Sequence, residues 1–89
     1  MFELKDRVIV LTGSTGVLAG ALAKSFAKAQ AELVLLGRNQ SLLDELKKTL
    51  EVHTHVECYT ADVLNRKELE TVRAAVMKSL GRIDALINA

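Results

Sequence analysis

The chain has 89 residues, of which 49% are hydrophobic and 26% charged, and 12 basic residues nearly balance 11 acidic ones. This composition excludes a disordered chain, which needs low hydrophobicity or a large net charge. It gives no basic surplus that would indicate a nucleic-acid partner.

The length allows one domain, residues 1–89, and leaves little room for separate cofactor and substrate regions. A single cysteine, Cys58, excludes an internal disulfide, so we expect a cytoplasmic protein rather than a secreted scaffold. The longest uncharged stretch, Val8–Ala23, is interrupted by the polar Thr12–Gly16, so it indicates neither a signal peptide nor a membrane partner.

The predicted elements alternate between strand and helix. Arg7–Leu11 is a short β-branched run typical of a buried parallel strand. Thr12–Gly16 predicts a turn, and a helix is expected from Val17 to Ala29. The apolar face expected for this helix is Leu18, Leu22, Phe26 and Ala29, opposite Lys24 and Lys28.

The second half of the chain repeats this alternation. Glu32–Leu36 predicts a strand, and Asn39–Ser41 opens a helix for which Ser41–Asp44 predicts a capping box. His53–Tyr59 predicts a third strand. The apolar stripe expected for the second helix is Leu43, Leu46 and Leu50. A third helix is expected to be capped by Asn65–Glu68 and to end at Gly81, with an apolar stripe of Leu69, Val72, Val76 and Leu80. A fourth strand is expected over Ile83–Ile87.

The order β-α-β-α-β-α-β predicts parallel strands joined by right-handed crossovers, with helices on both faces of the sheet. We therefore expect an α/β, doubly wound, Rossmann-type fold: a three-layer sandwich with strand order 3-2-1-4. Ligands of such sheets bind beyond the carboxyl ends of the strands, where the strand order reverses.

The turn after the first strand predicts a phosphate site. Gly13 allows a sharp exit at positive φ, and Gly16 keeps side-chain bulk away from a pyrophosphate. The helix that starts at Val17 and Leu18 offers unpaired N–H groups to that anion. The hydroxyls of Ser14 and Thr15 add candidate hydrogen bonds. The alternative is a tight turn that binds no ligand.

The same loop resembles the short-chain dehydrogenase/reductase family, whose motif is T-G-x-x-x-G-x-G. Thr12–Gly13 matches its opening, whereas Val17 and Ala19 stand where the motif has its second and third glycines. Gly16 and Gly20 each lie one position away. This variant is similar to the branch that contains sugar-acid oxidoreductases of the mannonate/fructuronate type.

Three later motifs follow the predicted strands in the family's order, so the resemblance covers the whole chain. Arg38 and Asn39 follow the second strand, Asp62 and Val63 the third, and Asn88–Ala89 the fourth. The chain stops inside that last motif, which suggests truncation after the fourth strand and an unpaired apolar edge. We expect such an edge to favour a homo-oligomer.

The resemblance implies a nicotinamide dinucleotide cofactor. An arginine such as Arg38, with no carboxylate until Asp44, favours NADP over NAD, the alternative. Asp62, with the Val63 backbone beside it, resembles the residue that accepts a hydrogen bond from adenine. Asn88 resembles the asparagine that stabilises the sheet and lines the cofactor pocket.

Simpler roles for these residues stay open. Arg38 is alternatively solvated, or stacks on adenine without selecting a phosphate. Asp62 is alternatively a helix-capping residue, and Asn88 a plain turn residue. His53 and His55 share a strand face, but without a third ligand they predict no metal site, and Cys58 points to the opposite face. Four basic residues predict solvated helix faces: Lys47, Lys48, Arg66 and Lys67.

The resemblance implies hydride transfer between NADP(H) and a small carbonyl or alcohol substrate. The family's catalytic serine, tyrosine and lysine lie downstream of the motif at Asn88. Tyr59 does not fit the family's Tyr-x-x-x-Lys pattern because position 63 is valine, so no catalytic residue is assigned. The alternative is a non-catalytic nucleotide-binding module.

Overall fold

The computed structural model describes residues 4–13 and 16–88 of the chain. The elements are β1 (Val8–Thr12), α1 (Val17–Lys28), β2 (Glu32–Gly37), α2 (Gln40–Leu50), β3 (Val56–Thr60), α3 (Arg66–Leu80) and β4 (Ala85–Asn88). The strands form one parallel sheet in the order β3-β2-β1-β4. The predicted fold class and strand order are both confirmed.

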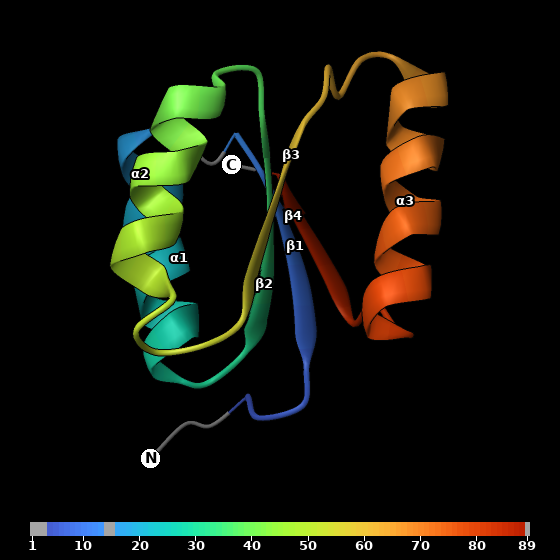
Figure 1. Cartoon of the computed structure of the whole chain (residues 1–89). Helices are drawn as coiled ribbons and strands as arrows, with labels where there is room; N and C mark the ends of the chain where they lie inside the picture. Colours follow the sequence, from blue (N-terminus) through green and yellow to red (C-terminus); the bar gives the residue numbers. More distant parts are fainter. Residues whose placement is uncertain (1–3, 14–15, 89) are drawn as a thin grey trace.

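The sheet lies between two helical layers, with α1 and α2 on one face and α3 on the other (Figure 1). The chain first moves outward from β1 to β2 and β3, and then returns to the far side of β1. Because each crossover is right-handed, this reversal of direction places α3 on the opposite face. The three-layer arrangement follows from that reversal.

The central strand β1 is buried along its whole length. Its residues pair with β2 on one side and β4 on the other, so that Val10 lies between Val34 and Leu86. Successive side chains point to opposite layers. Ile9 and Leu11 pack in the cluster that contains the buried residues of α1 and α2, and Val8 and Val10 in the α3 cluster.

The predicted apolar face of α1 is only partly correct. The side chains buried against the sheet are Ala19, Ala23 and Ala27, whereas Leu18 is 67% exposed. Phe26 packs at the side of the cluster and is half-buried. The alanine row recurs every four residues, and its small side chains bring the helix close to the sheet, so the larger residues fall to its flanks.

The predicted cap of α2 is wrong, although its buried face is confirmed. Asn39, rather than Ser41, is the N-cap, and its Oδ1 accepts a hydrogen bond from the Leu42 N–H at 3.1 Å. The Asp44 carboxylate instead accepts from Gln40 Nε2 at 2.7 Å. The members of the predicted apolar stripe of α2 pack in its core cluster: Leu43, Leu46 and Leu50.

The cap of α3 is confirmed, but only half of the predicted box forms. The Asn65 side chain accepts from the Lys67 and Glu68 N–H groups at 3.0 and 3.2 Å. The Glu68 carboxylate, however, accepts from the Asp62 N–H at 3.4 Å. The helix ends at Gly81, whose φ of 78° is typical of a left-handed C-terminal residue.

Strands β3 and β4 begin later than predicted. The N–H groups of His53 and Thr54 both bond to the Leu50 carbonyl and close the end of α2, so β3 begins at Val56 rather than His53. Strand β4 begins at Ala85 rather than Ile83. The residues before Val56 and before Ala85 therefore lie outside the strands, although their apolar or alternating pattern is typical of strands.

Asp84 fastens the start of β4 to β1. Its Oδ2 accepts from the Val8 N–H and from Arg82 Nε, each at 2.8 Å. Its own N–H donates to the Val8 carbonyl at 2.9 Å, and Arg7 lies 3.5 Å from Oδ1. The Arg82 guanidinium, followed by the Val8 N–H, lowers the pKa of Asp84 from 3.8 to about 2.

Within the described residues, no helix combines the length and the apolar character that a membrane crossing requires.

Acidification should test the Asp84 contacts. The pKa of Asp84 is depressed on folding, so its contribution to stability is present above pH 3.8 and is lost as the pH falls toward 2. We expect the wild type to lose more of its melting temperature between pH 5 and pH 2 than Asp84→Asn. Circular dichroism melts at several pH values measure this. Equal losses in both proteins would show that Asp84 adds no pH-dependent stability.

Candidate functional site

The carboxyl ends of the four strands meet at one edge of the sheet. Thr12 pairs in register with Leu36 and with Asn88, and Gly37 pairs with Thr60. The segments that follow these strands therefore converge there, as predicted. Three predicted site residues, Ser14, Thr15 and Ala89, lie outside the described residues.

The loop after β1 has the predicted glycine geometry. Gly13 adopts a φ of 66°, a conformation that side chains disfavour. Its carbonyl accepts from the Gly16 N–H at 3.0 Å, which closes the turn. A Cβ on Gly16 would lie 3.4 Å from that carbonyl oxygen. No contact with the described residues therefore requires glycine at position 16.

The first turn of α1 presents its backbone to solvent at this edge. Gly16 is its N-cap and supplies no side-chain hydrogen bond, and the turn contains no acidic residue. Val17 is 95% exposed, and Leu18 beside it is also exposed. The first N–H groups of a helix have no intrahelical partner and carry a partial positive charge. The first turn of α1 therefore holds no carboxylate that would repel an anion, and anion binding here stays a prediction.

Thr12 and Asn88 join β1 to β4 where the strands end. The buried Thr12 donates from Oγ1 to Asn88 Oδ1 at 2.7 Å and approaches the Ile87 carbonyl at 3.4 Å. This contact gives Asn88 a structural role beyond that of a plain turn residue. The sequence assigned Thr12 no site role, although it opens the same motif. Cofactor contact by Asn88 stays a prediction.

The next two strand ends are joined by an ion pair. Arg38 follows β2, Asp62 follows β3, and Arg38 Nη2 lies 2.9 Å from Asp62 Oδ1. The same Oδ1 accepts from the Leu64 N–H at 2.9 Å. The Leu64 N–H and then the Arg38 guanidinium lower the pKa of Asp62 below its ordinary value. The sequence placed both residues in the site but did not predict that they bind each other.

Asn39 and Val63, which follow Arg38 and Asp62 in the sequence, both contribute to the structure of the fold. The Asn39 carboxamide oxygen caps α2. Val63 packs against the core cluster on the α3 face. Neither contact prevents the backbone of these residues from meeting a ligand, and their predicted binding roles stay predictions.

A separate group of polar side chains surrounds Glu57 on β3. Its carboxylate accepts from Tyr59 at 2.9 Å and from Ser79 of α3 at 2.5 Å, and lies 3.0 Å from His55 Nε2. Burial acts to raise the pKa of Glu57, but the hydrogen bonds from Ser79, His55 and Tyr59 outweigh it and lower the pKa. Ser79 therefore joins α3 to β3 through Glu57, whereas the hydrogen bond from Tyr59 lies within β3.

Cys58 points to the other layer, as predicted, and its Sγ lies 3.6 Å from the Leu43 carbonyl. Burial raises the pKa of this thiol, which acts as a small core side chain. His53 lies in the turn before β3 rather than on the strand. Within the described residues, no three His, Cys, Asp or Glu side chains are grouped as metal ligands.

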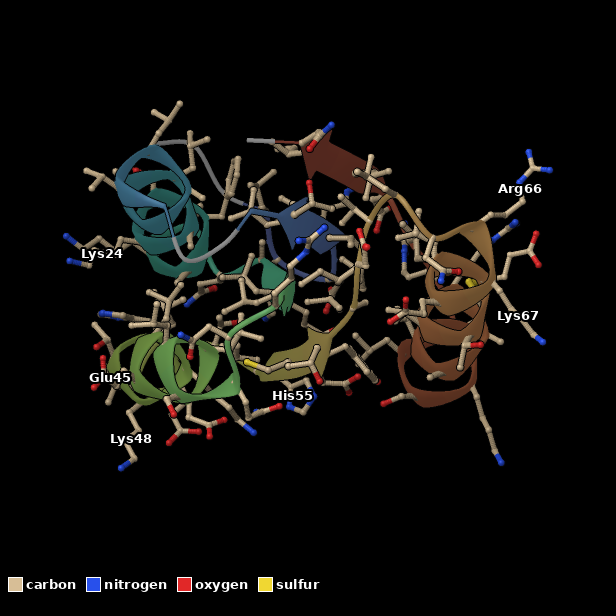
Figure 2. The ribbon with its side chains drawn as sticks, turned by 90° about the horizontal axis from the view of Figure 1, so that it is seen from above. Lys24, Glu45, Lys48, His55, Arg66 and Lys67 are labelled. Atoms are coloured by element: carbon tan, nitrogen blue, oxygen red, sulfur yellow. The ribbon has the colours of Figure 1, made fainter. Side chains whose placement is uncertain are left out.

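Of the four basic side chains that were expected to be solvated, Lys48, Arg66 and Lys67 are exposed, whereas Lys47 is half-buried. Figure 2 shows Lys48 projecting from α2, and Arg66 and Lys67 from α3 on the far side of the sheet. These three described side chains project from different helical layers and so do not form one continuous basic surface.

Comparisons with known proteins agree with this geometry. The family model described as short chain dehydrogenase matches residues 7–89. An uncharacterized oxidoreductase of Staphylococcus epidermidis is 32% identical over 89 residues, which are the whole of this chain and 38% of that protein. The chain thus spans about two fifths of the length of this relative.

Solved structures show the same fold. A protein assigned as a D-mannonate oxidoreductase, from Haemophilus influenza and with NAD bound, aligns with a TM-score of 0.89 and 29% identity. The alignment covers 96% of this chain and 31% of that one. A metagenomic short-chain oxidoreductase in complex with NADP aligns with a TM-score of 0.87 and 23% identity, over 93% of this chain and 38% of that one.

Two glycine substitutions should distinguish an effect on ligand binding from an effect on stability. Gly20 lies inside α1 with no described atom within 4 Å of an added Cβ, so Gly20→Ala should stabilise the protein by about 0.5–1 kcal/mol. Gly16→Ala should cost at most about 1 kcal/mol of helix capping but weaken dinucleotide binding at least about tenfold, since contact with the backbone is obstructed.

Thermal melts and calorimetric titrations measure the two effects, and Gly20→Ala is the control for binding. Unchanged binding by Gly16→Ala would contradict a close approach of the ligand to this turn.

Proposed function

Because the chain belongs to the short-chain dehydrogenase family, we propose that it is the NADP-binding part of an oxidoreductase. The proposed reaction transfers hydride between NADP(H) and a carbonyl or alcohol substrate. The observation that carries the proposal is the convergence of the Gly13 loop, Arg38, Asp62 and Asn88 at one edge of the sheet.

The loop and α1 bind the pyrophosphate in this proposal. Gly13 and Gly16 place no side chain in the way of the ligand, and the predicted hydrogen bonds from the Ser14 and Thr15 hydroxyls belong to the same proposal. The N–H groups of Val17 and Leu18 then donate to phosphate oxygens, aided by the helix dipole. The absence of an acidic residue from the first turn of α1 supports this role.

Arg38 recognises the 2′-phosphate of NADP. A guanidinium donates two parallel hydrogen bonds to a phosphate, and the Arg38 side chain is 71% exposed and therefore accessible to one. The first carboxylate after β2 in the sequence is Asp44, and it is engaged by Gln40 inside α2. Asp62 and the Val63 backbone receive the adenine, with Asn39 beside the ribose.

Asn88 lines the end of the site near the reacting part of the cofactor. Its link to Thr12 fixes its position between β1 and β4. The nicotinamide, when bound, supplies the hydride acceptor or donor. Tyr59 is assigned no catalytic role because its hydroxyl donates to Glu57 of the same strand, β3. The described residues therefore bind and orient the cofactor, and we propose that this chain alone does not turn over substrate.

The proposed substrate class is a sugar acid. It is supported by the T-G-x-x-G variant of the loop and by the likeness to the structure assigned as a D-mannonate oxidoreductase. A second candidate function, a nucleotide-binding module without any catalytic partner, is favoured by the same absence of a catalytic role for Tyr59.

Replacing Arg38 tests the cofactor choice. Arg38→Ala should weaken NADPH binding about tenfold or more and NADH binding less than about twofold, because only NADPH carries the 2′-phosphate. Calorimetric titration with NADPH, NADH and ADP measures this, and Arg66→Ala is a matched control on the far side of the sheet. Equal losses for both cofactors would show that Arg38 only stacks on adenine, and no binding by the wild type would refute the proposal.

Self-association through β4 forms the second part of the proposal. In the described chain β4 pairs with β1 alone, and Leu86 is 65% exposed beside an apolar groove of about 770 Å³ along α3. Such an edge offers unpaired backbone groups and apolar surface to a second copy.

Leu86→Lys should shift the protein toward monomer, because charge on an edge strand opposes strand pairing. Size-exclusion chromatography with light scattering measures the mass, with Leu42→Lys on the exposed side of α2 as the control. A wild type that is monomeric at all concentrations would contradict this part of the proposal.

A further inference from the structure

The two side chains of the Arg38–Asp62 ion pair differ in how far their contacts restrain them. Asp62 is fixed within its own turn, because its Oδ1 accepts from the Leu64 N–H and its N–H donates to Glu68. Arg38 is a long and mostly exposed side chain whose Nη2 lies 2.9 Å from Asp62 Oδ1. The carboxylate is therefore stationary, and the guanidinium is the partner that moves when a stronger anion arrives.

We propose that Asp62 competes with the 2′-phosphate of the cofactor for Arg38 and thereby limits the preference for NADPH over NADH. The proposal rests on the proposed function, in which Arg38 binds that phosphate. It makes Asp62 a specificity-determining residue in addition to its expected contact with adenine.

Electrostatics favours competition over cooperation between the two anions. A phosphate that approaches Arg38 meets a cation already paired with a carboxylate at 2.9 Å. It also enters the field of Asp62 and of Glu68, whose Oε1 lies 3.4 Å from the Asp62 nitrogen. The phosphate and these carboxylates carry like charges and repel each other, and NADH, which lacks the 2′-phosphate, avoids this repulsion.

The alternative is that Asp62 positions Arg38 for the phosphate. Surface ion pairs contribute little fixed geometry, because both side chains lose entropy and solvent screens their attraction. The high exposure of Arg38 thus indicates that Arg38 can exchange Asp62 for another anion, and that Asp62 does not hold Arg38 in one position.

Asp62→Asn removes the charge and keeps an oxygen that accepts from Leu64 and from adenine. We expect the ratio of the NADH to the NADPH dissociation constant to rise about three- to tenfold. The ratio is used because a lost adenine contact weakens both cofactors equally. Glu45→Gln is the matched control: it makes the same chemical change on the outer face of α2 (Figure 2) and should leave the ratio unchanged.

Titrations of the wild type, Asp62→Asn, Arg38→Ala and Glu45→Gln separate the outcomes. An unchanged ratio in Asp62→Asn overturns the inference, and a lower ratio overturns it by showing that Asp62 positions Arg38. Either result leaves the proposed function intact where Arg38→Ala selectively loses NADPH. If Arg38→Ala shows no selective loss, both the NADP assignment and this inference fail. The expected rise should shrink in 0.5 M NaCl, because salt screens exposed charges.

Discussion

Strand β1 is the constraint on which the remaining structure depends. It is buried over all five residues and bonded to a strand on each side, so it fixes both the register of the sheet and the height at which neighbouring strands end. Two side-chain contacts fasten it to β4: Asp84 at the amino end and Thr12 with Asn88 at the carboxyl end. The candidate site is the place where this alignment brings four chain segments together.

The features that the sequence predicted well are those that depend on pattern over several residues. Short β-branched runs separated by helical stripes specify parallel strands, and the alternation of elements leaves few topologies to choose from. The boundaries of β3 and β4, the cap of α2 and the buried face of α1 were predicted less well. The capping of α2 by Asn39 rather than Ser41, and the turn that takes His53 from β3, depend on competition between local hydrogen bonds. Hydrophobic pattern carries no information about that competition.

The site shows the same division. Glycine at positive φ and the convergence of Arg38, Asp62 and Asn88 were predictable, because they follow from motif position and strand order. The bonds between those residues were not. The contact between Arg38 and Asp62 depends on the conformations of both side chains and on the Leu64 N–H, which holds the Asp62 carboxylate in place. The spacing of residues in the sequence does not specify side-chain conformations or this hydrogen bond.

The alanine face of α1 has a consequence for how the site meets a ligand. Ala19, Ala23 and Ala27 have no side-chain rotamers to exchange, so the helix rests on the sheet without an adjustable layer between them. The end of the helix that follows Gly16 is thereby held in one orientation before any ligand arrives. A ligand that binds there does not need to reorder the helix, and preorganisation of this kind increases affinity without adding a contact.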